Sequence, residues 1–322
     1  MSLRIGLVGA GYWGARLLRV FRNLAGAEVA LVVERDPAKR ATSASDVPGA
    51  EQASALWNDA SIDAAVIATP PASHFELARA ALGAGKHCWV EKPLALRVGE
   101  ARELVALAAQ RDRTLFVDET FLYDPLVQRA RQWIAGGRLG RLLHLSFDRL
   151  GLGRIRRDSD VWWNSAAHDL SILRYLVPEP VESVRVEKFS YVQPGVADMC
   201  VGTVRLTTGV SAHVYVSWLS PLKRASVVVV GTRGMLAYEG RFEQRALTFY
   251  EYAHPEPAVV RSNVVPIDRF AATETVGGGG EEPLVLAAAA FVHAVRSGEP
   301  APSDGRHSLA VVELLAAGNP VG

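Results

Sequence analysis

Three glycines and a glutamate near the start of this 322-residue chain have the types and the spacing of a dinucleotide-binding turn. Gly9, Gly11 and Gly14 form a G-x-G-x-x-G pattern. Glycines there let the backbone turn tightly and approach a pyrophosphate, whose charge is stabilised at the N-terminus of the following helix. Glu34 lies about twenty residues further on, where a carboxylate can accept hydrogen bonds from ribose hydroxyls. That carboxylate would repel a 2′-phosphate and so favours NAD, although Arg35 beside it could accept the phosphate of NADP.

A lysine stands at the end of a predicted buried strand. The run CWVEKPLAL, residues 88–96, passes abruptly from apolar residues into Glu91, Lys92 and Pro93. Proline restricts the backbone of the residue before it, and an ammonium group beside a nicotinamide would stabilise negative charge developing on an oxygen. A lysine at a strand end is more often only a surface residue, so the motif alone leaves both interpretations open.

His168 is a candidate acid and base, because imidazole is the side chain whose unperturbed pKa lies nearest neutral pH. The spacing of Leu170, Leu173 and Leu176 predicts a helix with His168 in its first turn. A lone histidine is more often structural. Asn164 lies one helical turn earlier, and asparagine is also a favourable N-cap, so it could simply start the helix.

The elements that must position these residues change character along the chain. Apolar strand signals alternate with helical ones in the first third, as in the strands 4–8, 28–36, 63–71 and 87–93 and the crossover helix 75–85. This alternation predicts an α/β fold with a doubly wound parallel sheet of the Rossmann type. We expect residues 1–120 to form an NAD-binding domain.

The rest of the chain predicts a second, α+β domain over residues 121–322, for substrate binding and oligomerisation. Runs rich in Val, Tyr, Thr and Phe between about residues 142 and 250 indicate a large, mostly antiparallel sheet, with one hairpin turn near Thr208 and Gly209. Two helices over about residues 283–317 are expected to pack back toward the first domain.

Composition excludes several classes of protein. The 35 basic and 34 acidic residues nearly cancel, which argues against nucleic acid or a membrane surface as the main partner. Cys88 and Cys200 match neither a disulfide framework nor a metal site. We therefore expect no metal, and we expect a reduced, cytoplasmic setting. No signal peptide is expected before the first strand, and no apolar run reaches bilayer-spanning length.

Several motifs together resemble the glucose-fructose oxidoreductase, inositol dehydrogenase and MocA family. They are the glycine turn, EKP, TFLYDP at 120–125, GGRLGRLLHL at 136–145, HDLSILRYL at 168–176 and SGEPAPSDGRHSLAVVELL at 297–315. The resemblance covers nearly the whole chain. It implies an NAD(P)-dependent enzyme that acts on a sugar, a cyclitol or a nucleotide sugar.

The resemblance also implies roles for individual residues. Lys92 would hydrogen-bond the reacting oxygen from a Lys-Pro peptide that is often cis in the family, and His168 would move the proton. The family pattern has an aspartate where this chain has Asn164, which can hydrogen-bond but cannot carry a charge to tune either residue. The implied cofactor residues are Gly9, Gly11, Tyr12, Trp13, Gly14, Glu34, Arg35, Thr69, Pro70, His74, Glu91, Lys92 and Pro93. The implied substrate residues are Tyr123, Arg154, Arg157, Trp163, Asn164 and His168.

An arginine-rich loop suggests a class of substrate. Arg149, Arg154, Arg156 and Arg157 precede the His168 helix, where guanidinium groups could grip a diphosphate. With the motifs around it, this loop resembles the branch that oxidises UDP-sugars at the C3 hydroxyl. The alternative is that the arginine loop is only solvated or forms a subunit contact. Trp162 and Trp163, which follow the loop, could stack on the substrate or lie in the core.

The expected protein is therefore an NAD-dependent sugar dehydrogenase that forms a homodimer or homotetramer. A cyclitol or free-sugar dehydrogenase, a ketosugar reductase, and a non-catalytic NAD-binding regulator or scaffold are the alternatives.

Overall fold

A six-stranded parallel sheet in the order β3-β2-β1-β4-β5-β6 organises the N-terminal part of the computed structural model, which describes residues 2–152, 155–157, 159–240, 245–252 and 272–318. Its strands are β1 (Leu3–Val8), β2 (Ala27–Val33), β3 (Gly49–Ala50), β4 (Ala64–Ile67), β5 (His87–Val90) and β6 (Leu115–Val117). The chain reverses its direction of strand addition between β1 and β4, so the predicted doubly wound sheet is confirmed. Ligands bind such sheets outside the carboxyl ends of the strands, at this switch point.

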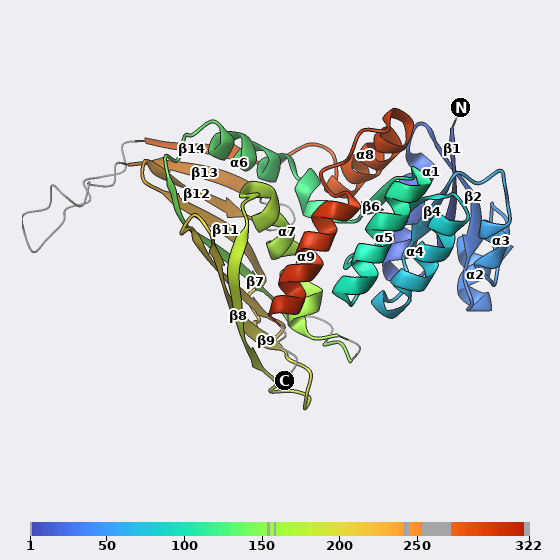
Figure 1. Cartoon of the computed structure of the whole chain (residues 1–322), viewed down its shortest axis with the longest axis horizontal. Helices are drawn as coiled ribbons and strands as arrows, with labels where there is room; N and C mark the ends of the chain where they lie inside the picture. Colours follow the sequence, from blue (N-terminus) through green and yellow to red (C-terminus); the bar gives the residue numbers. More distant parts are fainter. Residues whose placement is uncertain (1, 153–154, 158, 241–244, 253–271, 319–322) are drawn as a thin grey trace, which may run out of the picture. The chain divides into compact units, whose positions relative to one another are not determined.

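Helices cover the parallel sheet, and Figure 1 shows α4 and α5 lying side by side against it. Strands β4 and β5 are apolar along almost their whole length because side chains on both of their faces are buried. The helical elements of this part are α1 (Tyr12–Asn23), α2 (Pro37–Ser43), α3 (Ser54–Trp57), η1 (Pro71–Ser73), α4 (His74–Gly83), α5 (Val98–Arg111), η2 (Thr120–Tyr123), α8 (Pro283–Ser297) and α9 (Gly305–Ala317).

Contacts divide the chain into two units, one of Met1–Tyr123 with Glu281–Ala316 and one of Asp124–Gly280 with Ala317–Gly322. The C-terminal helices fold with the first unit: Val117 N donates to Ser303 O at 2.9 Å, and Phe291 of α8 lies edge-on to Trp89 with centroids 5.7 Å apart. The sequence-based division at residue 120 places these helices in the second domain. The sequence-based division, which concerns the parts of the chain that fold independently, stays a prediction.

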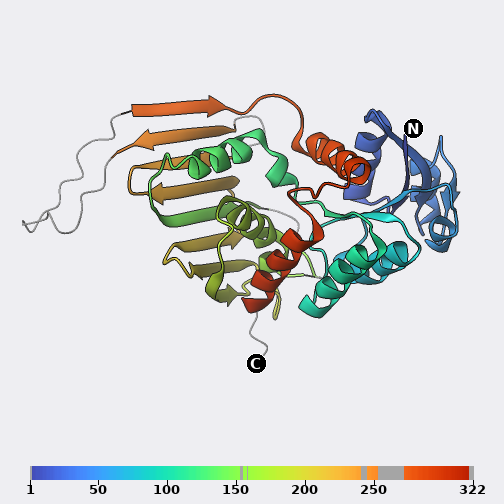
Figure 2. The same ribbon diagram turned by 45° about the horizontal axis from the view of Figure 1, so that its top comes forward.

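The second unit is built on an eight-stranded sheet in the order β14-β13-β12-β11-β7-β10-β9-β8, whose pairs are antiparallel except β7 with β10. Figure 2 shows α6 (Pro125–Ala135) and α7 (Ala167–Leu176) over one face of it. The mostly antiparallel sheet is confirmed, and so is the hairpin turn, since Gly209 has φ +86° between β9 and β10. The strands are β7 (Leu142–Leu150), β8 (Val181–Phe189), β9 (Met199–Leu206), β10 (Ser211–Ser217), β11 (Arg224–Gly231), β12 (Gly234–Glu239), β13 (Ala246–Glu251) and β14 (Ala272–Gly277).

Within the described ranges, no helix combines the length and the apolar character needed to cross a bilayer.

Candidate active site

The glycine turn joins β1 to α1 in a way that only glycine permits at two positions. Gly9 has φ +92°, and a Cβ on Gly14 would lie 1.9 Å from the Gly9 carbonyl oxygen. The start of α1 therefore packs directly on the turn. Gly11 is the N-cap of α1 and has no side chain to satisfy the first N–H groups of the helix, which leaves a position suited to a pyrophosphate.

Glu34 lies beside this turn, at the carboxyl end of β2. Its carboxylate accepts a hydrogen bond from Ala10 N at 2.7 Å and another from Asp36 N at 3.0 Å. A carboxylate has about four lone-pair positions, so ribose hydroxyls can bind to those that remain. Arg35 is exposed next to it.

Tyr12 and Trp13 occupy the first turn of α1. They are 59% and 40% exposed, and their rings pack edge to face with centroids 5.8 Å apart. The Arg16 guanidinium lies 4.5 Å from the centre of the Tyr12 ring. The predicted contact of both aromatic residues with cofactor stays a prediction.

The loop after β4 carries Thr69 and Pro70, and His74 ties it to the EKP loop. The fully buried His74 ring places Nδ1 at 2.8 Å from Pro93 O and Nε2 at 2.9 Å from Thr69 O. A neutral ring donates to one of these carbonyls and only imidazolium donates to both, but burial lowers the pKa of His74. No ring nitrogen is left for a direct cofactor contact, so His74 holds the two loops together.

Lys92 follows β5 at the same edge of the sheet as the glycine turn. Glu91 N donates to Ile67 O at 2.9 Å, which continues the β4–β5 ladder up to the motif. Lys92 is half-buried between the buried Glu91 and Pro93. The Lys92–Pro93 peptide is cis, as the resemblance implied.

Sequence reasoning missed a second carboxyl group beside Glu91. Val90 of β5 pairs in register with Val117 of β6, so Glu91 and Asp118 are neighbours where the two strands end. The two carboxyl groups are close enough to act on each other's pKa. Burial, reinforced by the charge of Asp118, raises the pKa of Glu91 well above its usual range, and burial raises the pKa of Asp118 to about 6. The available signal was an acid directly after the apolar run Leu115–Val117, on the strand that follows EKP.

In the second unit, His168 is the second residue of α7, as predicted. A π-helical turn over Trp162–Ala166 precedes it, which the sequence gave no sign of. The suggestion that Asn164 starts the helix is wrong, because the helical turn begins earlier and Asp160 Oδ1 accepts from Trp163 N at 2.9 Å. Asn164 lies inside the π turn, and π turns of this kind are frequent at functional sites.

The arginine loop is not a single cluster. Arg149 places Nε and Nη2 on both carboxylate oxygens of Asp169, at 2.7 to 3.1 Å, and Asp169 is 1% exposed. Arg149 is therefore committed to an ion pair inside the second unit rather than to a diphosphate. Arg157 is exposed, and Arg154 lies outside the described residues.

Two aromatic candidates belong to the core. Tyr123 is 3% exposed and its hydroxyl lies 2.9 Å from Ser303 Oγ, which corrects its expected place at the substrate. Trp162 is fully buried against Gly202, where a Cβ would come within 2.7 Å of the indole. Trp163 is half-buried and remains a substrate candidate.

Neither cysteine has the character of a reactive thiol. Cys88 and Cys200 are buried, and burial raises the pKa of the Cys200 thiol to about 12. Among the described residues, no group of three or more His, Cys, Asp or Glu side chains is arranged to hold a metal ion.

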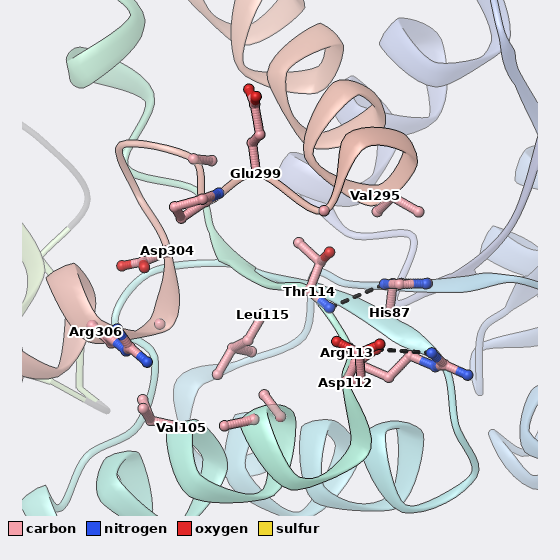
Figure 3. A pocket seen from close by; sticks show the side chains of 16 residues that line it. His87, Val105, Asp112, Arg113, Thr114, Leu115, Val295, Glu299, Asp304 and Arg306 are labelled. Carbon is pink, nitrogen blue, oxygen red and sulfur yellow. Dashed lines mark hydrogen bonds between the residues drawn. The ribbon is translucent and has the colours of Figure 1, made fainter.

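A cavity of about 520 Å³ in the first unit, shown in Figure 3, lies away from these residues. His87 and Leu115, which line it, are the first residues of β5 and β6. The cavity therefore opens at the amino ends of the strands, whereas the glycine turn, Glu34 and Lys92 lie at the carboxyl ends.

Comparison with known proteins agrees with this geometry. Residues 3–119 match the family profile described as "Oxidoreductase family, NAD-binding Rossmann fold", and residues 127–237 match the "GFO/IDH/MocA C-terminal domain". The chain belongs to the GFO/IDH/MocA oxidoreductase family, and its first unit contains the family's NAD-binding domain.

Individual relatives act on different substrates. The chain is 32% identical to UDP-N-acetylglucosamine 3-dehydrogenase of Acidithiobacillus ferrooxidans over 67% of each protein. It is 32% identical to inositol 2-dehydrogenase 2 of Saccharopolyspora erythraea over 56% of each. The solved structure of the Acidithiobacillus enzyme superposes with a TM-score of 0.85 at 24% identity, covering 98% of this chain and 96% of that one, which shows a shared fold. The first curated relatives are matched over only 51% to 57% of their own length.

Proposed function

We propose that this protein oxidises a secondary hydroxyl of a sugar or cyclitol, with hydride transfer to NAD. The observation that carries the proposal is Lys92 at the carboxyl end of β5, on the same sheet edge as the glycine turn and Glu34. When bound there, NAD supplies the hydride acceptor. Lys92 would hydrogen-bond the substrate oxygen and stabilise its negative charge, and His168 would take the hydroxyl proton.

A nucleotide sugar is the substrate class that we propose first. Support comes from the relative that is named as a UDP-N-acetylglucosamine 3-dehydrogenase and from exposed Arg157, on the loop before α7. The ion pair between Arg149 and Asp169 removes one arginine from the predicted diphosphate site. Arg157 is still able to bind a diphosphate. The C3 hydroxyl is the proposed position of oxidation.

A cyclitol is the second candidate, because inositol 2-dehydrogenases are also among the relatives. We further propose that the protein works as a homodimer or homotetramer. The sheet face opposite α6 and α7 carries half-exposed residues such as Ser146 and His213, and would be available to a second copy.

A panel of substrates with NAD tests the proposal. NADH formation is measured with UDP-, dTDP- and GDP-sugars, free sugars and inositols, and reduction of the matching ketosugars with NADH. We expect turnover of a UDP-sugar, and a raised KM for it in Arg157→Ala, since a lost charge-assisted contact costs about 1.5 to 3 kcal/mol. Equal turnover of free sugars would overturn the nucleotide-sugar assignment. Stabilisation by NAD without turnover of any member would favour a regulator.

A further inference from the structure

Two buried acids follow neighbouring strands next to the proposed catalytic lysine in the first unit. Glu91 and Asp118 follow the neighbouring strands β5 and β6, and only 7% and 2% of their surfaces are exposed. Among the described residues, Glu91 Oε1 and Asp118 Oδ2 have no hydrogen-bond partner. Buried acids with unsatisfied oxygens are costly to keep, so their presence calls for a reason other than stability.

The surroundings allow the pair one negative charge. Two carboxyl groups in contact cannot both ionise in a buried site, so they share a proton. Thr120 Oγ1 donates to Asp118 Oδ1 at 2.6 Å, which favours Asp118 as the ionised member and Glu91 as the donor between them. Among the described residues of the first unit, the titratable groups near the pair include Lys92, Glu119 after Asp118, and His74, whose ring contacts the Pro93 carbonyl.

Lys92, the residue after Glu91, is the cation whose charge acts on both acids. Burial raises the pKa of both acids, and the charge of Lys92 offsets part of that rise. By reciprocity, a negative charge on the pair favours an ammonium at Lys92. An ammonium donates a stronger hydrogen bond to a developing alkoxide than a neutral amine does. Asn164, where the family pattern has an aspartate, has no charge to offer.

We propose that Glu91 and Asp118 form a carboxyl pair with a single proton, whose negative charge keeps Lys92 protonated and in place, so that both acids are positioning residues for the reaction. This inference rests on the role proposed above for Lys92. The pair does not exchange its proton during turnover: the hydride goes to NAD, the hydroxyl proton goes to His168, and the shared proton stays between the two acids.

The shared proton can be observed without any substrate. Infrared difference spectra between NAD-bound wild type and NAD-bound Glu91→Gln at pH 7 should show the carbonyl band of one buried protonated acid in wild type. The band should be absent in Glu91→Gln, in which the amide can still donate to Asp118. A wild-type spectrum without that band would overturn the proposal.

The effect on Lys92 is measured by acetic anhydride labelling, because only the neutral amine reacts. The double variant Glu91→Gln/Asp118→Asn removes the negative charge of the pair. Labelling of Lys92 at pH 7 should then rise about tenfold, because a neighbouring charge shifts a pKa by about one unit or more. Mass spectrometry of the peptide that contains Lys92 measures the labelling. Glu91→Gln alone keeps the charge and should label like wild type. Asp304→Asn is the matched control and should also label like wild type, because it makes the same change in the first unit but at the amino ends of the strands. Unchanged labelling in the double variant would overturn the proposal.

Turnover provides the second readout. In the double variant kcat should fall about tenfold or more while KM and NAD affinity stay within about threefold, because a donor to the transition state is weakened. Thr120→Val keeps the charge but removes a hydrogen bond that lowers the pKa of Asp118, so the acidic limb of its kcat profile should move to higher pH. This variant serves if the double variant does not fold, and an unmoved limb would then count against the pair. Full turnover in Lys92→Ala would instead refute the proposed function, while the infrared band would still decide whether the acids share a proton.

Discussion

Glu34 links the glycine turn to the segment after β2 through one carboxylate. It holds Ala10 N of the glycine turn and Asp36 N after β2, so its position is fixed before any cofactor binds. A carboxylate fixed in this way can bind ribose hydroxyls without an ordering cost and repels a 2′-phosphate.

We expect Glu34→Ala to weaken NAD binding by about tenfold or more, because hydrogen bonds to a charged group contribute about 1.5 to 3 kcal/mol. NADP binding should change less, so the preference for NAD narrows. Calorimetric titration with both cofactors measures this. Glu28→Ala is the matched control, since Glu28 lies on the same strand in an exposed ion pair with Arg4. A wild-type protein that binds NADP more tightly would refute the argument.

For individual residues, the sequence predicted which side chains belong to the site better than it predicted the side chains that they contact. Glu34 and Lys92 were found because each closes a short motif whose spacing is set by one strand and one turn. Asp118 was missed because its significance depends on β5 and β6 lying in register, a pairing that no local pattern encodes. Tyr123 was misassigned because the partner of its hydroxyl, Ser303, is distant in the sequence.

Helix α7 is held on the sheet by a buried ion pair. Arg149 of β7 forks onto Asp169, the residue after His168, with 16% of the arginine side chain exposed. Removing one member of such a pair leaves the other charge buried and unpaired. The pair therefore fixes the end of the helix from which His168 projects.

Arg149→Met should lower the free energy of unfolding by about 3 to 5 kcal/mol, because Asp169 loses its counter-charge. Arg149→Met/Asp169→Leu should recover most of that loss. Urea unfolding measures both. Arg224→Ala is the control: Arg224 pairs with Asp148 at 3.5 Å and is 49% exposed, so its loss should cost at most about 1 kcal/mol. Equal costs for Arg149→Met and Arg224→Ala would contradict the assignment.

Element types were predictable where periodicity is strong, as for the parallel strands and for α7. The π turn at Trp162–Ala166 was not, because it shares the apolar spacing of an α-helix over so short a stretch. The order of the eight strands in the second sheet could not be predicted from the sequence either, since β7 and β10 pair in parallel although sixty residues separate them in the chain.

At the scale of the whole molecule, the proposed reaction gives one role to Lys92, in the first unit, and another to His168, in the second. The C-terminal helices show how the chain ties distant parts of its sequence into one unit. Phe116 pairs with Asp304, and Arg102 lies 2.7 Å from Glu313 of α9. Periodicity found these helices, but only tertiary contacts reveal that they belong with the parallel sheet.

The most direct test of the account is the rate of NADH formation with saturating NAD and the UDP-sugar found in the substrate panel, in wild type, Lys92→Ala and His168→Ala. We predict turnover in wild type and a loss of kcat of about a hundredfold or more in each variant, because each lacks a group that acts on the reacting oxygen or its proton. Calorimetry should show that both variants still bind NAD, since Glu34 and the glycine turn are untouched. Undiminished turnover in either variant would contradict the proposed roles of Lys92 and His168.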